Sequence, residues 1–144
     1  MKEQNYQNHV RFHPFFHFFL FPLTFALFVA SVFNLFPAFR GGMELWFAVV
    51  LMLGSLALVF TVLLARTYAN KVQNRVVRVE ENFRHYRLIG QPLDPDLTMA
   101  QIIALRFASD EEFPGLCARA LQERLSADDI KKAVTTWRAD HVRV

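Results

Sequence analysis

Two long stretches of the chain consist almost entirely of apolar residues. Residues 14–39 contain no Asp, Glu, Lys or Arg over 26 positions, and residues 45–65 contain none over 21. A membrane-spanning helix needs about 20 predominantly apolar residues, whereas helices buried in soluble proteins are usually shorter and keep a polar face. The pattern therefore predicts two membrane-spanning helices, at about 14–36 and 43–65, in preference to a soluble core.

A cleaved signal peptide is the other interpretation of the first stretch. Its apolar region would span about 7–15 residues and end at a small-x-small cleavage site. The stretch here is longer and has no convincing site of that kind. We therefore expect it to remain as a helix of the mature protein.

The segment between the two stretches, Pro37-Ala-Phe-Arg-Gly-Gly42, has the composition of a tight turn. Proline is expected to stop the first helix and the paired glycines to reverse the chain, which gives an antiparallel hairpin. The turn carries only Arg40, whereas six Lys and Arg residues follow the second span before Gly90. Because Lys and Arg are retained on the cytoplasmic side, both termini should be cytoplasmic.

Both predicted spans carry small or polar residues at helical spacing. Small residues allow helices to approach closely in lipid, so we expect the hairpin to pack through these faces. The residues concerned are Ala26, Ala30, Asn34, Gly54, Ala57 and Thr61. Pro22 has no N–H to donate to the carbonyl of Phe18. We expect it to kink the first helix unless a hydroxyl such as that of Thr24 satisfies this carbonyl.

Beyond the second span the helical pattern continues without a breaker to Ile89, where Gly90, Pro92 and Pro95 end it. Apolar residues alternate spacings of three and four along this segment, which is a heptad seam held for about two heptads. The seam consists of Ala69, Val72, Val76, Val79, Phe83 and Tyr86. It can pack against the C-terminal helices of its own chain or against copies of itself.

Positive charge is concentrated beside the second span. Residues 66–90 contain six basic and two acidic residues, whereas residues 91–144 contain seven basic and nine acidic ones. Lys and Arg near an anionic leaflet are each worth about 1 kcal/mol, so lipid headgroups are the expected partners. The residues assigned to this role are Arg11, Arg66, Lys71, Arg75 and Arg78. Nucleic-acid binding, the competing use of a basic stripe, is disfavoured by the acidic module beyond it.

The C-terminal segment reads as three short helices, each with a start signal. Thr98 precedes Gln101 by three residues, Ser109 precedes Glu112, and Ser126 precedes Asp129, as in a capping box. The carboxylates of Asp110, Glu111 and Glu112 are interpreted as charges that complement a helix N-terminus, in preference to a catalytic cluster.

The predicted fold class is thus all-α: a transmembrane helical hairpin, a long juxtamembrane helix and a small cytoplasmic helical module. The corresponding segments are a cytoplasmic tail at 1–13, the hairpin at 14–65, the basic helix at 66–90 and the module at 91–144. Cys117 is the single cysteine, which excludes an intrachain disulfide. It lies in an apolar stripe and is expected to be a core thiol and not a nucleophile.

His9, His13 and His17 lie four residues apart at the start of the first apolar stretch. Pro14 favours the first turn of a helix, which leaves His9 and His13 before it. A haem held by two histidines would usually need one from a second helix, and zinc would need three or four ligands. The second span has no histidine. We therefore expect the imidazole rings to lie among lipid headgroups and to bind neither a metal nor a cofactor. Haem or quinone contact by His13 and His17 is the alternative.

The chain resembles a family of small bacterial two-span membrane proteins of uncharacterised function. The resemblance lies in residues 8–17 (Asn-His-x-Arg-x-His-Pro-x-x-His), in Ala104-Leu-Arg-Phe-Ala-Ser-Asp-Glu-Glu-Phe-Pro114, and in Ile130-Lys-Lys followed by Trp137-Arg-Ala-Asp140. It implies the two-span topology and a bacterial source, and hence the cytoplasmic (inner) membrane. It supplies no activity and no catalytic residue.

Three functions fit these features, and none is enzymatic. The first is a membrane scaffold or accessory subunit that presents its helical module to itself or to a larger membrane complex. It is favoured because packing surface is abundant and no reactive constellation is assembled. The second is a small homo-oligomeric channel or transporter lined by Asn34, Ser55 and Thr61. The third is a redox subunit that uses His13 and His17.

Overall fold

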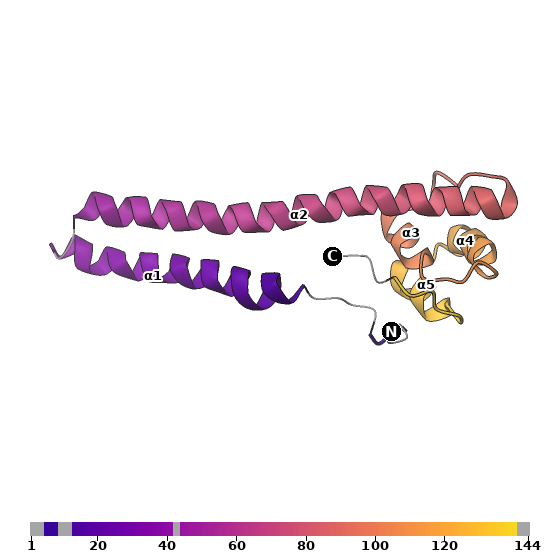
Figure 1. The fold of residues 1–144 in the computed structure, drawn as a ribbon, viewed down its shortest axis with the longest axis horizontal. Coiled ribbons are helices and arrows are strands. Elements are labelled where there is room, and N and C mark those ends of the chain that lie inside the picture. The colour runs from indigo at the N-terminus through magenta and orange to yellow at the C-terminus, as the bar shows by residue number, and fades with distance from the viewer. Residues whose placement is uncertain (1–4, 9–12, 42–43, 141–144) are drawn as a thin grey trace. The chain divides into compact units, whose positions relative to one another are not determined.

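In the computed structural model, residues 5–8, 13–41 and 44–140 are described, and within these ranges the chain is all-helical and contains no strand. A short π-helix, η1 (Phe15–Leu20), runs directly into α1 (Phe21–Phe39). It is followed by α2 (Leu45–Ile89), α3 (Met99–Leu105), α4 (Phe113–Gln122) and α5 (Ala127–Ala133) (Figure 1). The chain divides into two compact units: Phe12–Ala69 forms one, and Met1–Arg11 with Asn70–Val144 forms the other.

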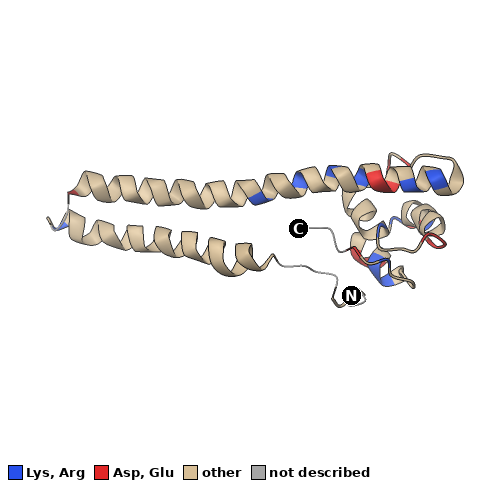
Figure 2. Ribbon diagram, in the orientation of Figure 1, with Lys and Arg blue, Asp and Glu red and all other residues tan. Residues whose placement is uncertain are grey.

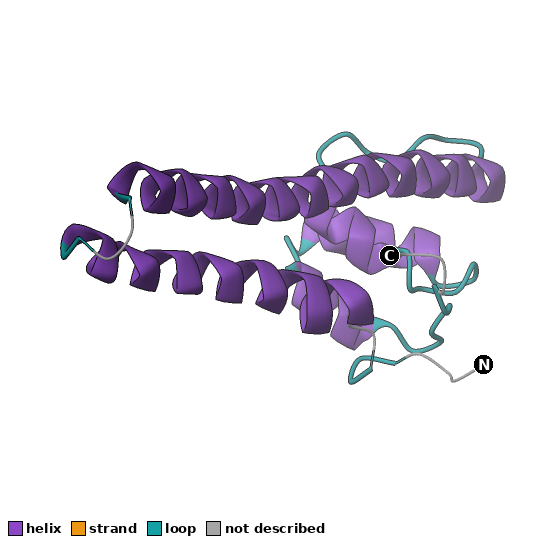
Figure 3. Cartoon of the chain, turned by 60° about the vertical axis from the view of Figure 1, so that its left-hand side comes forward, coloured by secondary structure: helices purple, strands orange, loops and turns teal. Residues whose placement is uncertain are grey.

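In the first unit, α1 and the beginning of α2 run antiparallel as a hairpin (Figures 1 and 3). Two helical segments, Phe15–Phe39 and Leu45–Ile89, are long and apolar enough to cross a membrane. Only 11% and 17% of their most apolar windows are buried, whereas the core helix of a soluble protein would be mostly buried. Figure 2 shows Lys and Arg on the later part of α2 and none along α1.

The hairpin packs through residues that recur every seven positions. The buried residues of α1 are Thr24, Ser31 and Ala38, and those in the hairpin part of α2 are Ala48, Ser55 and Val62. The hydroxyl oxygens of Ser31 and Ser55 lie 2.7 Å apart, in a hydrogen bond that joins the two helices. Small side chains here let the backbones approach, and the hydroxyl pair satisfies both polar groups inside the contact.

This contact uses different faces from those predicted. The side chains of Ala26, Ala30, Asn34, Gly54, Ala57 and Thr61 are all exposed in the hairpin. Asn34 donates to the Ala30 carbonyl, and Thr61 donates to the Ala57 carbonyl. Both spans carry small residues on more than one face, so small size alone did not identify the contact. The observed faces differ from the others in that they carry Ser31 and Ser55. The two hydroxyls can bond each other only when these faces meet.

The two prolines of the first helix also behave differently from expectation. The amide of Phe21 donates to the carbonyl of Phe16, five residues back, so the chain widens into a π-helical turn directly before Pro22. Pro22 therefore lies at the start of α1, where its missing N–H costs little. The Thr24 hydroxyl bonds the carbonyls of Leu20 and Phe21 and not that of Phe18.

Pro37 was expected to stop the first helix, but it lies inside the last turn. Helix α1 ends at Phe39, two residues further on. The amide of Gly41 donates to the carbonyl of Ala38 at 3.1 Å. Gly41 has a positive φ of 84°, a left-handed conformation that glycine adopts without a Cβ clash. The left-handed glycine, and not the proline, marks the turn.

Helix α2 runs unbroken to Ile89, which confirms the prediction that the pattern continues past the second span. Gly90, with a φ of 74°, ends the helix, and its amide donates to the Tyr86 carbonyl at 2.8 Å. From here on, the module means the described residues from Asn70 onward, which adds the last part of α2 to the C-terminal segment.

The module has a compact apolar core in which Phe107 and Phe113 are fully buried. Capping boxes at Thr98 and Ser126 open α3 and α5, as predicted. Helix α4 begins at Phe113 and not at Ser109, because residues 110–112 form a turn. A bridge between Ala108 and Trp137 brings the C-terminal segment back to the end of α3. Residues 5–8 also join this unit, since the Tyr6 hydroxyl donates to Asp128 at 2.7 Å.

Candidate functional site

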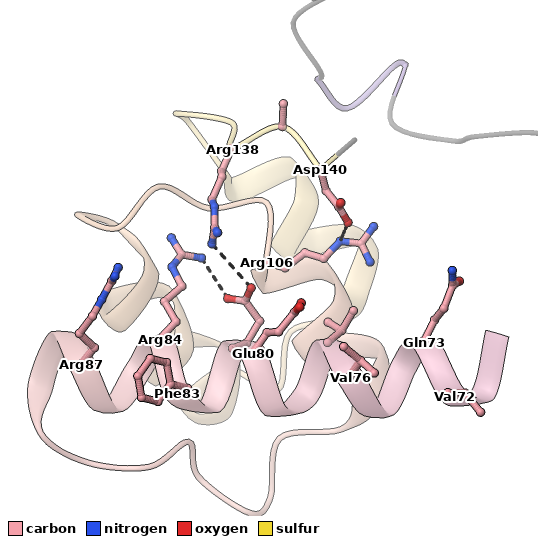
Figure 4. A pocket seen from close by; sticks show the side chains of 13 residues that line it. Val72, Gln73, Val76, Glu80, Phe83, Arg84, Arg87, Arg106, Arg138 and Asp140 are labelled. Atoms are coloured by element: carbon pink, nitrogen blue, oxygen red, sulfur yellow. Dashed lines mark hydrogen bonds and ion pairs between the residues drawn. The ribbon is translucent and has the colours of Figure 1, made fainter. Parts of the chain in front are cut away.

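A pocket of about 590 Å³ lies in the module between α2 and two later segments (Figure 4). One wall is α2, from Val72 to Arg87, and the other contains Arg106 and residues 138–140. The α2 wall is mixed, with Val72, Val76 and Phe83 beside charged residues. The pocket therefore combines apolar surface with four guanidinium groups and three carboxylates.

Arg84 is the central cation of this site and is 5% exposed. Its guanidinium donates to Glu81 at 3.0 Å and to Asp110 at 2.6 Å. A third bond, of 2.7 Å, reaches the carbonyl of Ala108. The group also lies 4.3 Å from the centroid of the Phe113 ring. The planar fork of arginine can bind three partners at once, and here it joins Glu81 on α2 to the segment 108–110 that follows α3.

Two further guanidinium groups of the pocket also have carboxylate partners. Arg138 reaches the second oxygen of the buried Glu81 at 3.7 Å, and Arg106 lies 3.2 Å from Asp140. Figure 4 shows Arg84 and Arg138 approaching from opposite walls. The pocket thus has nearly as many carboxylates as guanidinium groups, so it carries no large excess of positive charge for binding an anion. Its ion pairs join different segments and hold the module together.

The arrangement contains no recognisable set of groups for acid–base or nucleophilic chemistry among the described residues. The Nδ1 atom of His85 lies 2.8 Å from the carbonyl of Gln91, to which it donates, and its ring meets that of Phe113 edge-on. Its role is therefore to tie the end of α2 to the following loop. No group of three or more His, Cys, Asp or Glu residues in the described ranges is placed to hold a metal ion.

Of the acidic triplet, Glu112 and Asp110 contact other elements. The carboxylate of Glu112 accepts hydrogen bonds from the amides of Thr135 and Thr136 and from the Thr135 hydroxyl. It also accepts one from the Ser109 amide. Asp110 binds Arg84 on α2. The interpretation as helix-end charge is therefore incomplete, since two of the three carboxylates fix the chain after α5 or the end of α2.

The stability of the module should depend on the ionisation of Glu112. Partial burial raises the pKa of this carboxyl, but hydrogen bonds from Thr135, Thr136 and Ser109 outweigh it and leave the pKa below its usual value of 4.5. A lowered folded-state pKa contributes stability above the unfolded value, which is lost as the pH falls through the folded value. We expect Glu112→Gln to destabilise the module at pH 7 and the difference from wild type to shrink below about pH 4.5. Urea unfolding at several pH values would measure this, and a pH-independent difference would contradict it.

Cys117 is buried at 3% exposure in the module core, as the sequence indicated. Burial and the nearby negative charge of Glu81 raise the pKa of the thiol to about 12, although Arg84 acts in the opposite direction. Because only the thiolate reacts readily, we expect negligible labelling by a maleimide at pH 7.5 until the module unfolds. An Arg78→Cys variant, with its new thiol on the exposed side of α2, should label at once. Equal labelling rates at the two sites would contradict this assignment.

The histidine cluster is described only in part, because His9 and Arg11 lie outside the described residues. The amide of Phe16 donates to the ring nitrogen Nδ1 of His13 at 3.3 Å, and Nδ1 of His17 donates to the His13 carbonyl at 3.0 Å. His13 thus caps the first turn, which agrees with its predicted place before the helix. Contact of either ring with haem or quinone stays a prediction.

Four of the basic residues expected at lipid headgroups lie within the described ranges, and of these Arg66 is half-buried and the others are exposed. The Arg66 guanidinium lies 5.5 Å from the centroid of the Phe16 ring, so Arg66 contacts η1. Lys71, Arg75 and Arg78 follow along α2. Their assignment to headgroups remains a prediction.

The heptad seam does not pack against the C-terminal helices of its own chain. Val72, Val76, Val79 and Phe83 are each at least 50% exposed. The rest of the module instead contacts the other side of α2, where Val77, Glu81, Arg84 and His85 are buried. Sequence reasoning missed this because charged residues at a spacing of three look like a solvated helix face. No local signal could have revealed the partner of Arg84, since Asp110 lies 26 residues further along the chain.

A family model with the description "Family of unknown function (DUF6526)" matches residues 1–144. No curated protein and no solved structure matches the chain.

Proposed function

Because this chain belongs to the DUF6526 family, whose function is unknown, we propose a role for it from its structure: a non-enzymatic membrane scaffold. The hairpin anchors the chain, and the module presents a binding face to a membrane complex. The single observation that carries the proposal is the exposed apolar face of α2 beyond the uncharged spans. A continuous exposed apolar face is typical of an interaction site, and Val72, Val76, Val79 and Phe83 form such a face here.

In the proposed topology the hairpin spans a bacterial inner membrane and both termini are cytoplasmic. Two observations support this topology: the hairpin has an even number of candidate spans, and Tyr6 contacts Asp128 of the module. The Lys and Arg residues that follow the second span favour the cytoplasmic side. In this arrangement Arg66, Lys71, Arg75 and Arg78 lie near anionic headgroups.

The described residues assemble no recognisable reactive site, and this favours a scaffold over an enzyme. Arg84, Arg106 and Arg138 bind carboxylates, His85 bonds a backbone carbonyl, and Cys117 is buried. These groups tie α2 to α3, α4 and the C-terminal segment. A rigid module is what a presentation surface requires.

The proposal is tested by fractionation and native gel electrophoresis of membranes from the source cell. We expect the protein to stay in the pellet after an alkaline carbonate wash. In mild detergent we expect it to migrate as an assembly larger than one chain. Val76→Asp, at the centre of the exposed face, should reduce this assembly, whereas Arg78→Asp, on a neighbouring face, should not. Release by carbonate, or migration as a single chain in the wild type, would refute the scaffold.

A further inference from the structure

The exposed face of α2 has the periodicity of a coiled coil. Ala69, Val76 and Phe83 recur every seven residues, and so do Val72, Val79 and Tyr86. These two sets are the a and d positions of a heptad repeat. Val72, Val79 and Phe83 are 62%, 69% and 67% exposed, so the seam is open to solvent along the described chain.

We propose that this seam pairs with the same seam of a second copy, in parallel and in register. The proposal rests on the scaffold role, because it names the partner that the exposed face binds. Two copies inserted in one membrane with the same topology have their α2 helices pointing in the same direction. A parallel arrangement is therefore imposed by the anchor, and an antiparallel one is excluded between copies in the same membrane.

Charge complementarity along the flanks of the seam supports a second copy over an unrelated partner. In a parallel pair, a residue at position g faces the e residue five positions later on the other helix. With the seam in this register, Arg75 occupies g and Glu80 occupies e. Arg75 of each copy therefore faces Glu80 of the other, which gives two opposite-charge contacts by symmetry.

The other flanking pairs contain no like charges. Tyr68 at g faces Gln73 at e, and Asn82 at g faces Arg87 at e. Like charges at these positions would oppose association. All six flanking positions of the seam are thus compatible with an identical partner in this register.

The membrane anchor also explains how so short a seam can associate. About two and a half heptads form a marginal coiled coil when the helices are free in solution. Anchoring removes most of the translational freedom that association must otherwise restrict, and it raises the effective concentration of one seam around another. The helix is also already formed, since α2 is continuous from Leu45.

Pairing would also change the pocket in the module. Val72, Val76 and Phe83 belong both to the seam and to the lining of the pocket, and Glu80 lies on the same wall. A second α2 along the seam would therefore border the open side of the pocket. The Arg75 side chain of that copy would approach the pocket at Glu80.

Cysteine cross-linking in the full-length, membrane-embedded protein tests the register. Single cysteines are placed at the three d positions, as Val72→Cys, Val79→Cys and Tyr86→Cys, and oxidised with copper phenanthroline. The native Cys117 is buried and serves as an internal blank. In a parallel, in-register pair all three variants should form disulfide-linked dimers, whereas Arg78→Cys on the neighbouring face should form at least about fivefold less. Cross-linking at only one d position, at none, or equally at position 78 would overturn the proposal.

Charge exchange tests the flanking contacts. Arg75→Glu and Glu80→Arg each place like charges opposite one another at both symmetric contacts. Exposed ion pairs are individually weak, so we expect each variant to lower the Val79→Cys cross-linking yield about two- to tenfold. The double variant restores opposite charges and should recover the yield. Failure of the double variant to recover would overturn the register.

The two proposals fail in different ways. If the native gel still shows an assembly sensitive to Val76→Asp but no d position cross-links, the partner is another protein, and only the pairing is refuted. If the wild type migrates as a single chain, the scaffold is refuted as well.

Discussion

Replacing Arg84 with methionine is expected to lower the free energy of unfolding of the module by about 3–5 kcal/mol. Arg84 is 5% exposed and binds Glu81, Asp110 and the carbonyl of Ala108. Methionine fills a similar volume but leaves the side chain of Glu81, 7% exposed, with only the longer 3.7 Å contact to Arg138. A buried charge that loses its partner carries its full desolvation cost.

Arg87→Met is the matched control. Arg87 is also on α2 and also binds Asp110, but at 3.4 Å and with a side chain that is 63% exposed. Exposed ion pairs contribute about 0–1 kcal/mol, so this variant should unfold close to wild type. Arg84→Lys should fall between the two, because it keeps the charge but not the planar fork.

The measurement is urea unfolding of the full chain in detergent, followed by the fluorescence of Trp137, which packs on Phe107 in the module. A Trp46→Phe background removes the only other tryptophan, which lies in the hairpin. Adding Glu81→Gln to Arg84→Met should recover part of the loss, because the uncompensated charge is removed. Equal unfolding midpoints for Arg84→Met and Arg87→Met would show that the buried network does not hold the module together.

Phe113→Ala is the second substitution with a large expected effect. Phe113 is fully buried at the start of α4, and its ring contacts both the guanidinium of Arg84 and the ring of His85. Truncation of a buried phenylalanine costs about 3–5 kcal/mol, through lost transfer energy and the cavity left behind. It should also loosen Arg84, since the ring forms one side of its binding site.

Phe83→Ala makes the same chemical change at a side chain that is 67% exposed. In dilute protein with excess detergent, where copies are separated, it should change the free energy of unfolding by less than about 0.5 kcal/mol. The same Trp137 fluorescence assay applies to both variants. A comparable loss for the two would contradict the assignment of Phe113, and not Phe83, to the core.

Local signals in the sequence were sufficient to predict most of the helices. The capping boxes at Thr98 and Ser126 and the unbroken pattern up to Ile89 lie within short segments, and the structure has these features at those places. The two uncharged stretches likewise predicted two helices long and apolar enough to cross a membrane. Such signals depend on neighbours along the chain, which the sequence displays directly.

Which face of each helix is buried could not be predicted in the same way. On α2 the apolar heptad looked like the buried side, yet Val72, Val76 and Val79 are exposed and Glu81 and Arg84 are buried. Burial of a charged face is favourable only when partners from distant segments meet it, as Asp110, Ala108 and Arg138 do here. In the hairpin, spacing alone did not distinguish Ala26 and Ala30 from Thr24 and Ser31, because the deciding partner, Ser55, lies on the other helix.

The sequence by itself determined where the chain is helical, which segments are apolar enough for a membrane and where the charges lie, because these follow from composition and from contacts a few residues apart. Only the tertiary structure decided which face of each helix is buried, what Arg84 and Glu112 bind, and that the apolar seam of α2 is left open. The physical reason is that burial is a property of pairs of surfaces. A helix face is buried when another segment satisfies its polar groups and fills its shape, and that segment can lie anywhere in the chain.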